Sequence, residues 1–444
     1  MEDIRDYGAK VDGVTNDTQA VRKAKKAAGA GGTIYFPAGT TIVDSKDRTG
    51  PECLRFVSKD TEGISLVGDG PGKSIVKVEG GHTDNHKGIT YYPDYNHDGA
   101  EIKNLTFDGN WSEQSPTNGD WMNAFGVHIR GDNQQVTIEN CVFKNWVTNG
   151  GLLGAAGITV KNSTFRDNGW GVAQEGREGH GFNVYTRGGS GRVTVENCLF
   201  DNNVGQAIDS RGGSVSVRNT VMKIDDAAIK LNGPTDDVLL ENVHIIGKSG
   251  TRIPIKCVPT GDEGTGTLRL YSIVIENAGW PAIDLPRRPG SIEGDNILIK
   301  NVDTGGQRNA GFYIDSSRTV NIGKLSIHDV SGSALRFSGA SGTIDELVYS
   351  GVSDVGDSDG VSITTSRAGD PIAVAVPSAS QVGAGTRSTS GDNSTDDTTG
   401  KYGNYNQPDP GTVDWHVPLN ENFSEISSDI ESLAQRIDEL ESRL

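Results

Sequence analysis

Charged, amide and aromatic residues recur at one position of a repeated four-residue pattern. The pattern is a Gly or Ala, an apolar residue, a variable residue and usually a second apolar residue. Sugars bind to such side chains, because aromatic rings stack on pyranose faces while amides and carboxylates bond to hydroxyls. The pattern therefore indicates a carbohydrate-binding row, with a plain solvated strand face as the alternative. The variable positions are His128, Leu153, Asn183, Asp209, Lys230, Lys256, Asp284, Tyr313, Arg336 and Ser362.

Residues beside this row complete the predicted site. Insertions at 107–125 and 165–182 interrupt the repeat, and loops over a rigid face commonly carry function. We therefore expect the site near residues 181–232, walled by these loops. The predicted catalytic residues are Asp209, Arg211, Lys230, His180 and Glu175. The predicted substrate-binding residues are His128, Arg130, Trp170, Asn183, Tyr185, Asp226, Asn232, Asp284 and Tyr313.

Two chemistries fit these residue types. Glycoside hydrolysis needs two carboxylates about 5–5.5 Å or about 6.5–9.5 Å apart. Asp209 could pair with Glu175 or Glu178, or with Asp225–Asp226. β-Elimination needs a base that removes the proton next to a uronate carboxylate. Arg211 or Lys230 could be that base, with Asp209 and Asp226 beside a cation.

Calcium would be the only cofactor in this scheme, and no metal ligand is assigned. His180 with Tyr185 would be a metal-free version of the same elimination. The HxxxH spacing of His82 and His86 has no helix to support a metal site.

A repeat of about 22 residues must position all these side chains. An Asn followed three residues later by a large apolar residue recurs at spacings of 36, 22, 35, 22 and 23 residues. The strands between turns are short, and their residues alternate between apolar and polar. The connections between strands are also short, which excludes βαβ units. The sequence therefore predicts an all-β, right-handed, single-stranded parallel β-helix with an internal aromatic column and an Asn ladder. The pairs are Asn104 with Phe107, Asn140 with Phe143, Asn162 with Phe165, Asn197 with Phe200, Asn219 with Met222 and Asn242 with Ile245.

Stacked coils lie about 4.8 Å apart, which decides several pairings. Cys141 and Cys198 occupy one column with Ser163 between them, so they lie about 9–10 Å apart and cannot form a disulfide. We expect both to be reduced core residues. Asp209 and Asp284 are three coils apart, about 14 Å, and cannot act as a catalytic pair.

The first coil carries a family resemblance. Residues 3–43 read as an acidic and aromatic start, Gly-Ala, Asp-Gly, a helix at about 18–28 and then GGTIYFPAGTT. This order resembles the N-terminal signature of the pectate-lyase-like superfamily, which includes polysaccharide lyases, polygalacturonases and phage tailspikes. The resemblance implies the β-helix fold, with chemistry left open. IDDAAIKLN resembles the aspartate pair of polygalacturonases and Gly179–Gly181 their histidine motif, but the order is reversed and no Arg-Ile-Lys follows.

The C-terminal part has a different composition. We divide the chain into an N-terminal cap and first coil (1–45), the β-helix (46–376), a flexible Ser/Thr/Gly/Asp-rich linker (377–412) and a coiled-coil segment (413–444). Apolar residues alternate at steps of 3 and 4 over 423–444, and Arg436–Glu441 matches a short trimerisation pattern. The sequence therefore predicts a homotrimer through 423–444, with a single docked helix as the alternative. WHVPLNENF at 415–423 resembles a motif of phage tail-fibre proteins.

Charge and hydropathy narrow the partners. A net charge of −18 argues against a nucleic-acid partner, and no apolar run is long enough for membrane insertion. The first residues do not resemble a signal peptide, and we expect an extracellular or virion location. The leading hypothesis is a glycan-recognising spike or fibre protein, with or without polysaccharide cleavage, bound to surface polysaccharide and to other virion tail proteins. The alternatives are a secreted lyase or glycoside hydrolase acting on acidic polysaccharide, and a purely structural fibre.

Overall fold

The computed structural model describes the chain from residue 1 to residue 385, with gaps. The described ranges are 1–44, 52–82, 87–91, 95–114, 125–130, 135–154, 157–169, 183–184, 192–210, 213–231, 237–248, 253–257, 266–286, 290–304, 308–315 and 318–385. The predicted coiled coil and trimer interface at 423–444, and most of the predicted linker, lie outside these residues.

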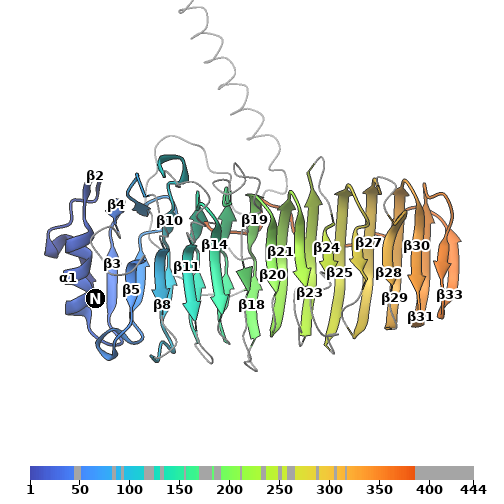
Figure 1. Ribbon diagram of the computed structural model, residues 1–444, viewed down its shortest axis with the longest axis horizontal. Helices are drawn as coiled ribbons and strands as arrows, with labels where there is room; N and C mark the ends of the chain where they lie inside the picture. The colour runs from blue at the N-terminus through green and yellow to red at the C-terminus, as the bar shows by residue number, and fades with distance from the viewer. Residues whose placement is uncertain are drawn as a thin grey trace, which may run out of the picture. The chain divides into compact units, whose positions relative to one another are not determined.

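Short parallel strands stack coil upon coil along one axis (Figure 1). They form two sheets, here called A and B, and all the pairings between the described strands are parallel. The predicted all-β parallel β-helix is confirmed. Sheet B contains β5 (Glu52–Phe56), β8 (Lys87–Tyr91), β11 (Phe125–Arg130), β14 (Asn149–Gly154), β17 (Asn183–Val184), β20 (Gln206–Ser210), β22 (Ala227–Leu231), β24 (Ile255–Cys257), β26 (Ile283–Leu285), β28 (Ala310–Asp315), β30 (Ser333–Ser338) and β32 (Gly356–Ser358).

Sheet A contains the remaining strands, which pair in two runs over the first coils and merge into long strands further on. They are β1 (Glu2–Asp3), β2 (Asp12–Asn16), β3 (Thr33–Phe36), β4 (Gly39–Val43), β6 (Ser65–Gly68), β7 (Ser74–Val78), β9 (Glu101–Lys103), β10 (Thr106–Asp108), β12 (Thr137–Glu139), β13 (Val142–Lys144), β15 (Thr159–Lys161), β16 (Thr164–Arg166), β18 (Arg192–Glu196), β19 (Leu199–Asn203), β21 (Ser214–Ile224), β23 (Asp237–Gly247), β25 (Thr267–Ala278), β27 (Ser291–Val302), β29 (Thr319–Val330), β31 (Ser341–Ser350) and β33 (Val361–Ala368). One α-helix, α1 (Thr18–Ala28), lies where the sequence predicts a helix and buries Val21 and Ala24.

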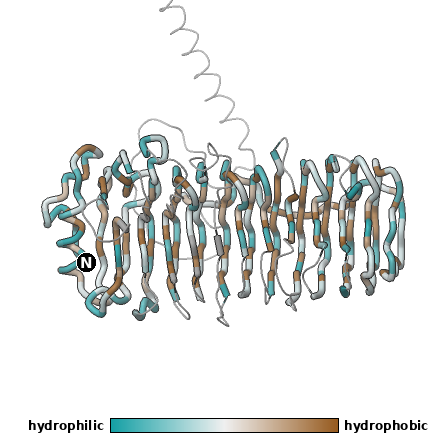
Figure 2. The backbone as a smooth tube through the Cα atoms, viewed as in Figure 1, coloured by the Kyte–Doolittle hydropathy of each residue, from teal (hydrophilic) through white to brown (hydrophobic). Residues whose placement is uncertain are grey.

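Hydrophobic and hydrophilic residues alternate along the strands (Figure 2), and the buried hydrophobic side chains fill the space inside the coils. The predicted aromatic column is present: Phe107, Phe143, Phe165 and Phe200 stack with ring centroids 5.0–5.2 Å apart and are at most 1% exposed. Met222 and Ile245 continue the column in register. Identical residues stack because each coil presents the same position to the next one at the same height.

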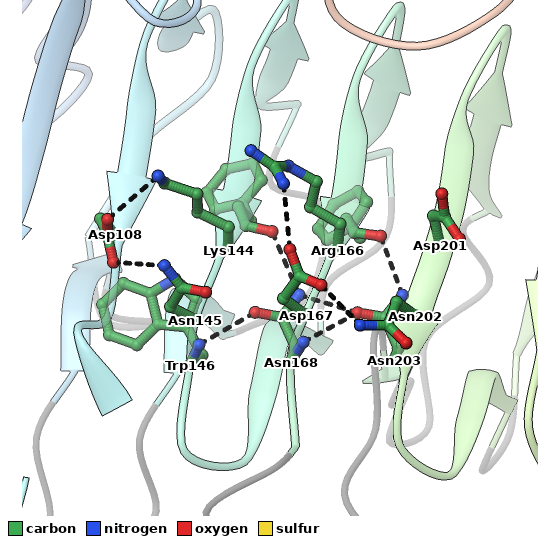
Figure 3. A network of polar contacts seen from close by, with 12 residues as sticks. Asp108, Lys144, Asn145, Trp146, Arg166, Asp167, Asn168, Asp201, Asn202 and Asn203 are labelled. Atoms are coloured by element: carbon green, nitrogen blue, oxygen red, sulfur yellow. Dashed lines mark hydrogen bonds and ion pairs between the residues drawn. The ribbon is translucent and has the colours of Figure 1, made fainter. Parts of the chain in front are cut away.

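Asparagines turn the chain at two corners. The predicted ladder from Asn104 to Asn242 has φ of 47–59°, and the Asn140 amide donates to Asn104 Oδ1 at 2.7 Å. Asn tolerates this left-handed conformation, and its amide joins neighbouring coils. A second ladder follows the Phe column (Figure 3), where Asn145 donates to Asp108 and Asn202 to Asp167. The sequence repeat therefore specifies both the turns and their cross-links.

The cysteines give a direct test of this core. All four are free and buried, as expected for Cys141 and Cys198. Ser163 lies between these two in the column, and its Oγ accepts a hydrogen bond from the Cys141 backbone amide at 3.1 Å. Burial raises the pKa of Cys141 and Cys198 to about 12, so neither forms a thiolate at neutral pH.

We predict that a thiol reagent at pH 8 modifies none of the 4 cysteines in the native protein and all of them in denaturant. Rapid modification of native Cys141 or Cys198 would contradict the stacked core.

The described chain ends differently from the prediction. The amides of Gly383 and Gly385 donate to Asn197 O and Asn140 Oδ1, both at 2.8 Å. Residues 377–385, which the sequence assigns to a flexible linker, are thus bound to the β-helix far from its last coil. The Ser- and Gly-rich composition of 377–385 did not indicate this docking.

Candidate functional site

The variable positions of the four-residue pattern fall in one column on sheet B, here called the polar column. Strand pairing places each residue directly beside the next in the neighbouring coil. In order, the column contains Arg55, Thr90, His128, Leu152, Asn183, Asp209, Lys230, Lys256, Asp284, Tyr313, Arg336 and Asp357. Eight of the ten predicted positions are therefore aligned as the repeat requires.

Two predicted members of the column are wrong. Leu153 pairs with Ile129 and is fully buried in the core, and Leu152 takes its place in the column. The glycines at both ends of GLLG left the alternation ambiguous by one residue. Ser362 lies on β33 of sheet A, where it pairs with Thr343, and Asp357 on β32 occupies the last place in the column.

Two lysine–carboxylate pairs lie at the middle of the column. Asp209, on β20, is fully buried, and Lys230 on β22 brings its Nζ within 3.8 Å of Asp209 Oδ2. One coil further on, Lys256 Nζ lies 2.5 Å from Asp226 Oδ2, which also accepts a hydrogen bond from Gln206 Nε2. The strand register explains the pairing, because Asp209, Lys230 and Lys256 follow one another in neighbouring strands.

These pairs lie in a largely desolvated place. The side chains of Lys230 and Lys256 are each 14% exposed, and the Asp226 side chain is 11% exposed. Burying a charge is costly unless an opposite charge accompanies it, so the lysines and carboxylates hold one another in place. A lysine ammonium therefore lies beside each of Asp209 and Asp226, where the sequence predicts a cation. An ammonium in such a place can attract an anionic ligand or exchange a proton with it.

A second cluster lies further along the same column. Arg308 Nη1 contacts Asp284 Oδ1, and the Arg308 guanidinium lies 4.6 Å from the centre of the Tyr313 ring. Arg336 approaches the same ring at 6.0 Å. Burial raises the pKa of Asp284 despite the neighbouring arginine, and burial together with Asp315 raises the pKa of Tyr313. The cluster therefore joins an aromatic ring to two guanidinium groups.

Sequence reasoning missed Arg308. It lies in the turn before β28, where Arg308 has a φ of 56° and Asn309 a φ of 47°. The only signal for Arg308 in the sequence was the turn-forming stretch GGQRNAG, which leads into the four-residue pattern that begins at Gly311.

The remaining predicted residues differ in what the structure says of them. His128 is only 4% exposed and packs against the Phe125 ring, so little of its surface can reach a ligand. For Arg130 and Asn183 the structure describes the backbone alone, at strand positions in sheet B. His180, Glu175, Trp170, Tyr185, Arg211 and Asn232 lie outside the described residues.

Within the described ranges, no group of three or more His, Cys, Asp and Glu side chains is arranged so that it could hold a metal ion. His82 pairs with Asp44 at 3.1 Å, and His97 packs edge-on against Tyr91. No helix in these ranges is long and apolar enough to cross a membrane.

Comparison with known proteins places this geometry among related chains. Residues 2–245, more than half of the chain, match the model of the family described as rhamnogalacturonase A/epimerase, pectate lyase-like. Mannuronan C5-epimerase AlgE2 of Azotobacter vinelandii is 28% identical over 263 residues, which are 54% of this chain and 25% of the epimerase. The chain thus spans about a quarter of that relative's length.

Two solved structures share the fold. The A-module of mannuronan C-5 epimerase AlgE6 from Azotobacter vinelandii superposes with a TM-score of 0.61 at 17% identity, over 84% of this chain and all of the module. The surface protein and adhesin PfbA of Streptococcus pneumoniae gives 0.54 at 16% identity, over 82% of this chain and 99% of that one. At these identities the likeness concerns the backbone fold.

Proposed function

Since the chain belongs to the rhamnogalacturonase A/epimerase, pectate-lyase-like family, we propose that it binds an acidic polysaccharide along the polar column. The observation that carries the proposal is the alignment of Asp209, Lys230, Lys256, Asp284, Tyr313 and Arg336 in successive coils of one sheet. A polymer has repeating groups, and a face that repeats every coil can meet them one after another.

The charges in the column favour an anionic ligand. Lys230 and Lys256 lie in adjacent coils about 4.8 Å apart, and Arg336 lies three coils beyond Lys256. Each cation is near a carboxylate or an aromatic ring, which fixes its position before the ligand arrives. Tyr313 adds a ring between the Arg308 and Arg336 guanidinium groups. Carboxylate groups of a uronate polymer suit such cations, and the Tyr313 ring suits a sugar face.

The setting we propose is an extracellular or virion-borne spike or fibre. The support is the tail-fibre-like motif at 415–423 and the heptad pattern at 423–444, which would join three chains. Three parallel binding columns would turn weak sugar contacts into firm attachment through avidity. Size measurement of the full chain by light scattering tests the trimer: a monomer at micromolar concentration would contradict this part of the proposal.

An enzyme acting on acidic polysaccharide is the second candidate. It is favoured by the relative AlgE2, a mannuronan C5-epimerase, and by the buried Asp209–Lys230 pair. Lys230, in its uncharged amine form, would remove the proton next to the uronate carboxylate, and Lys256 would stabilise the negative charge that develops there. A proton delivered to the opposite face of that carbon gives an epimer, whereas loss of the glycosidic oxygen from the neighbouring carbon, which takes up a proton, gives an unsaturated end.

One assay separates these functions. The full chain is immobilised, polymannuronate, polygalacturonate and neutral dextran are passed over it, and the eluate is examined for unsaturated ends, for reducing sugars and, by NMR, for epimerised uronate residues. Retention of an acidic polymer without products identifies a binder, and products identify an enzyme. We expect Lys256→Ala to reduce retention at least tenfold. The matched control is Lys324→Ala, on sheet A, whose lysine pairs with Glu346 at 3.1 Å. No retention of either acidic polymer, or equal loss in both variants, would contradict the proposal.

A further inference from the structure

The end of the described chain runs back along the outside of sheet A. Gly369 N bonds to Tyr349 O near the last coil, and Ile372 N bonds to Ser326 Oγ on β29. At the other end, Ala384 N donates to Thr164 Oγ1 on β16 at 2.9 Å. Residues 371–385, here called the strap, are thus tied at both ends to coils that are distant in sequence.

Outward residues of sheet A form an apolar stripe beneath the strap, here called the outer stripe. Strand pairing places Thr164, Leu199, Val221, His244, Val274, Leu298, Ser326 and Val348 in one column. Val221 and Val348 are fully buried, while Val274 and Leu298 are 5% and 7% exposed. Outward residues are buried only when something covers them, and the strap is tied to both ends of this column.

The strap has the length and the periodicity to cover the stripe. Ser326 and Thr164 are six coils apart, about 29 Å, and the thirteen residues from Ile372 to Ala384 can span that distance when extended. Ile372, Val374 and Val376 are half-buried, whereas the alanines between them are exposed. Val382 is 3% exposed, and a Cβ on Gly383 would lie 2.6 Å from Thr164 Oγ1. The strap is thus seated as an extended segment with one face on the stripe.

A buried histidine lies under the start of the strap. His328 Nε2 lies 2.5 Å from Ser326 Oγ, and His328 Nδ1 lies 2.7 Å from Ser350 Oγ. A neutral ring has one donating and one accepting nitrogen, so one of the two serine hydroxyls donates to it, and Ser326 Oγ also accepts the strap amide of Ile372. With a protonated ring both nitrogens donate, so that serine hydroxyl hydrogen loses its acceptor and a charge is buried beneath the strap.

We propose that the strap and the outer stripe form a reversible binding pair that opens when His328 gains a proton. In the closed form the strap holds Gly383 and Gly385 beside Asn197 and Asn140. In the open form the stripe loses this cover. This inference does not depend on the polysaccharide site, which lies on sheet B.

The charges around His328 set the direction of the effect. Asp329 on β29 and Asp370, directly before the strap, favour the protonated ring. Lys300 on β27 is the strand neighbour of His328 and pairs with Glu276, and its positive charge opposes protonation. Burial is the largest influence and lowers the pKa of His328. A histidine with a lowered pKa binds its proton more weakly in the closed form. Strap docking is therefore fully stable above pH 6.5 and weakens as the pH falls below it.

Hydrogen–deuterium exchange of the full chain at pH 7.5 and pH 5.0, corrected for intrinsic exchange rates, tests the pair. The amides of Gly383, Ala384 and Gly385 report docking. We expect their protection to fall at least fivefold at pH 5.0, with a ceiling of about 30-fold set by an ordinary histidine pKa near 6.5. Amides of β25 should keep their protection, because the coils themselves stay folded.

Four variants complete the experiment. His328→Gln and His328→Asn stay neutral, so their strap protection should change less than twofold between the two pH values. Val382→Asp should release the strap at both, and Ala375→Asp, at an exposed strap position, should behave as the wild type. A wild-type change below twofold, the same fall in both neutral variants, or joint loss of protection in β25 would overturn the proposal. If both neutral variants leave the strap undocked at both pH values, the wild-type profile decides.

Discussion

Replacing Phe165 by alanine is expected to lower the free energy of unfolding by about 4 kcal/mol. The ring is fully buried and stacks on Phe143 at 5.0 Å and on Phe200 at 5.2 Å. Its removal leaves a cavity between two coils that cannot close, since the backbone ladders on both sides hold the coils at a fixed separation. Urea unfolding followed by circular dichroism measures the change.

The control for this experiment is Val14→Ala, because Val14 is 85% exposed. We expect that change to shift stability by less than about 0.5 kcal/mol. A loss below about 1.5 kcal/mol in Phe165→Ala would mean that the column does not carry the core. Repeat proteins need not unfold in one step, so the midpoints from fluorescence and circular dichroism should be compared in both variants.

Replacing Lys256 by alanine is expected to cost about 3 kcal/mol of stability and most of the polysaccharide binding. The loss of stability has a specific cause. Asp226 is left largely buried with the Gln206 side-chain amide on its Oδ2 and no cation beside it, and an uncompensated buried carboxylate is costly. Thermal unfolding gives the stability, and retention on polymannuronate gives the binding.

A double variant separates the two effects. Asp226→Asn with Lys256→Met removes both charges, and Gln206 can still donate to the asparagine oxygen. We expect its stability to lie within about 1 kcal/mol of the wild type, because a buried pair can be replaced by neutral groups at little cost. Its binding should remain lost, since the cation is gone. A double variant as unstable as Lys256→Ala would show that packing of the lysine stem, and not the buried charge, determines stability.

The repeat made most of the fold readable in advance. The spacing of Asn104, Asn140, Asn162 and Asn197 defined the coils, and their positive φ shows why asparagine is required there. The column of sheet B followed from the same spacing, because residues one period apart become neighbours when coils stack. The repeat period tells at which level of the stack a residue lies. The alternation within a strand tells whether its side chain points into the core or outward.

Periodicity does not say to which sheet a strand belongs. Ser362 has the same local pattern as the column residues but lies on sheet A, since both sheets alternate apolar and polar residues in the same way. Nor does it say which side chains meet. Arg308 contacts Asp284 from a turn, and Asp226 contacts Lys256 from the position directly before a strand. Neither pair occupies equivalent positions in neighbouring repeats.

The strap was missed although the sequence held a signal for it. Ile273–Ile275 and Ile297–Ile299 are apolar at three consecutive positions, so one residue of each three must face outward. Strands that are apolar on both faces are usually covered on both faces. The Ser and Gly content of 378–385 indicated a linker instead, because composition reports flexibility and not the presence of a groove.

The central claim is that an acidic polysaccharide lies along the polar column. The most direct measurement is a crystal structure of the full chain with a bound oligouronate. The claim predicts ligand density over sheet B, with carboxylates near Lys230, Lys256 or Arg336 and a sugar ring against Tyr313. Density on sheet A, or at an end of the stack with the column empty, would contradict it.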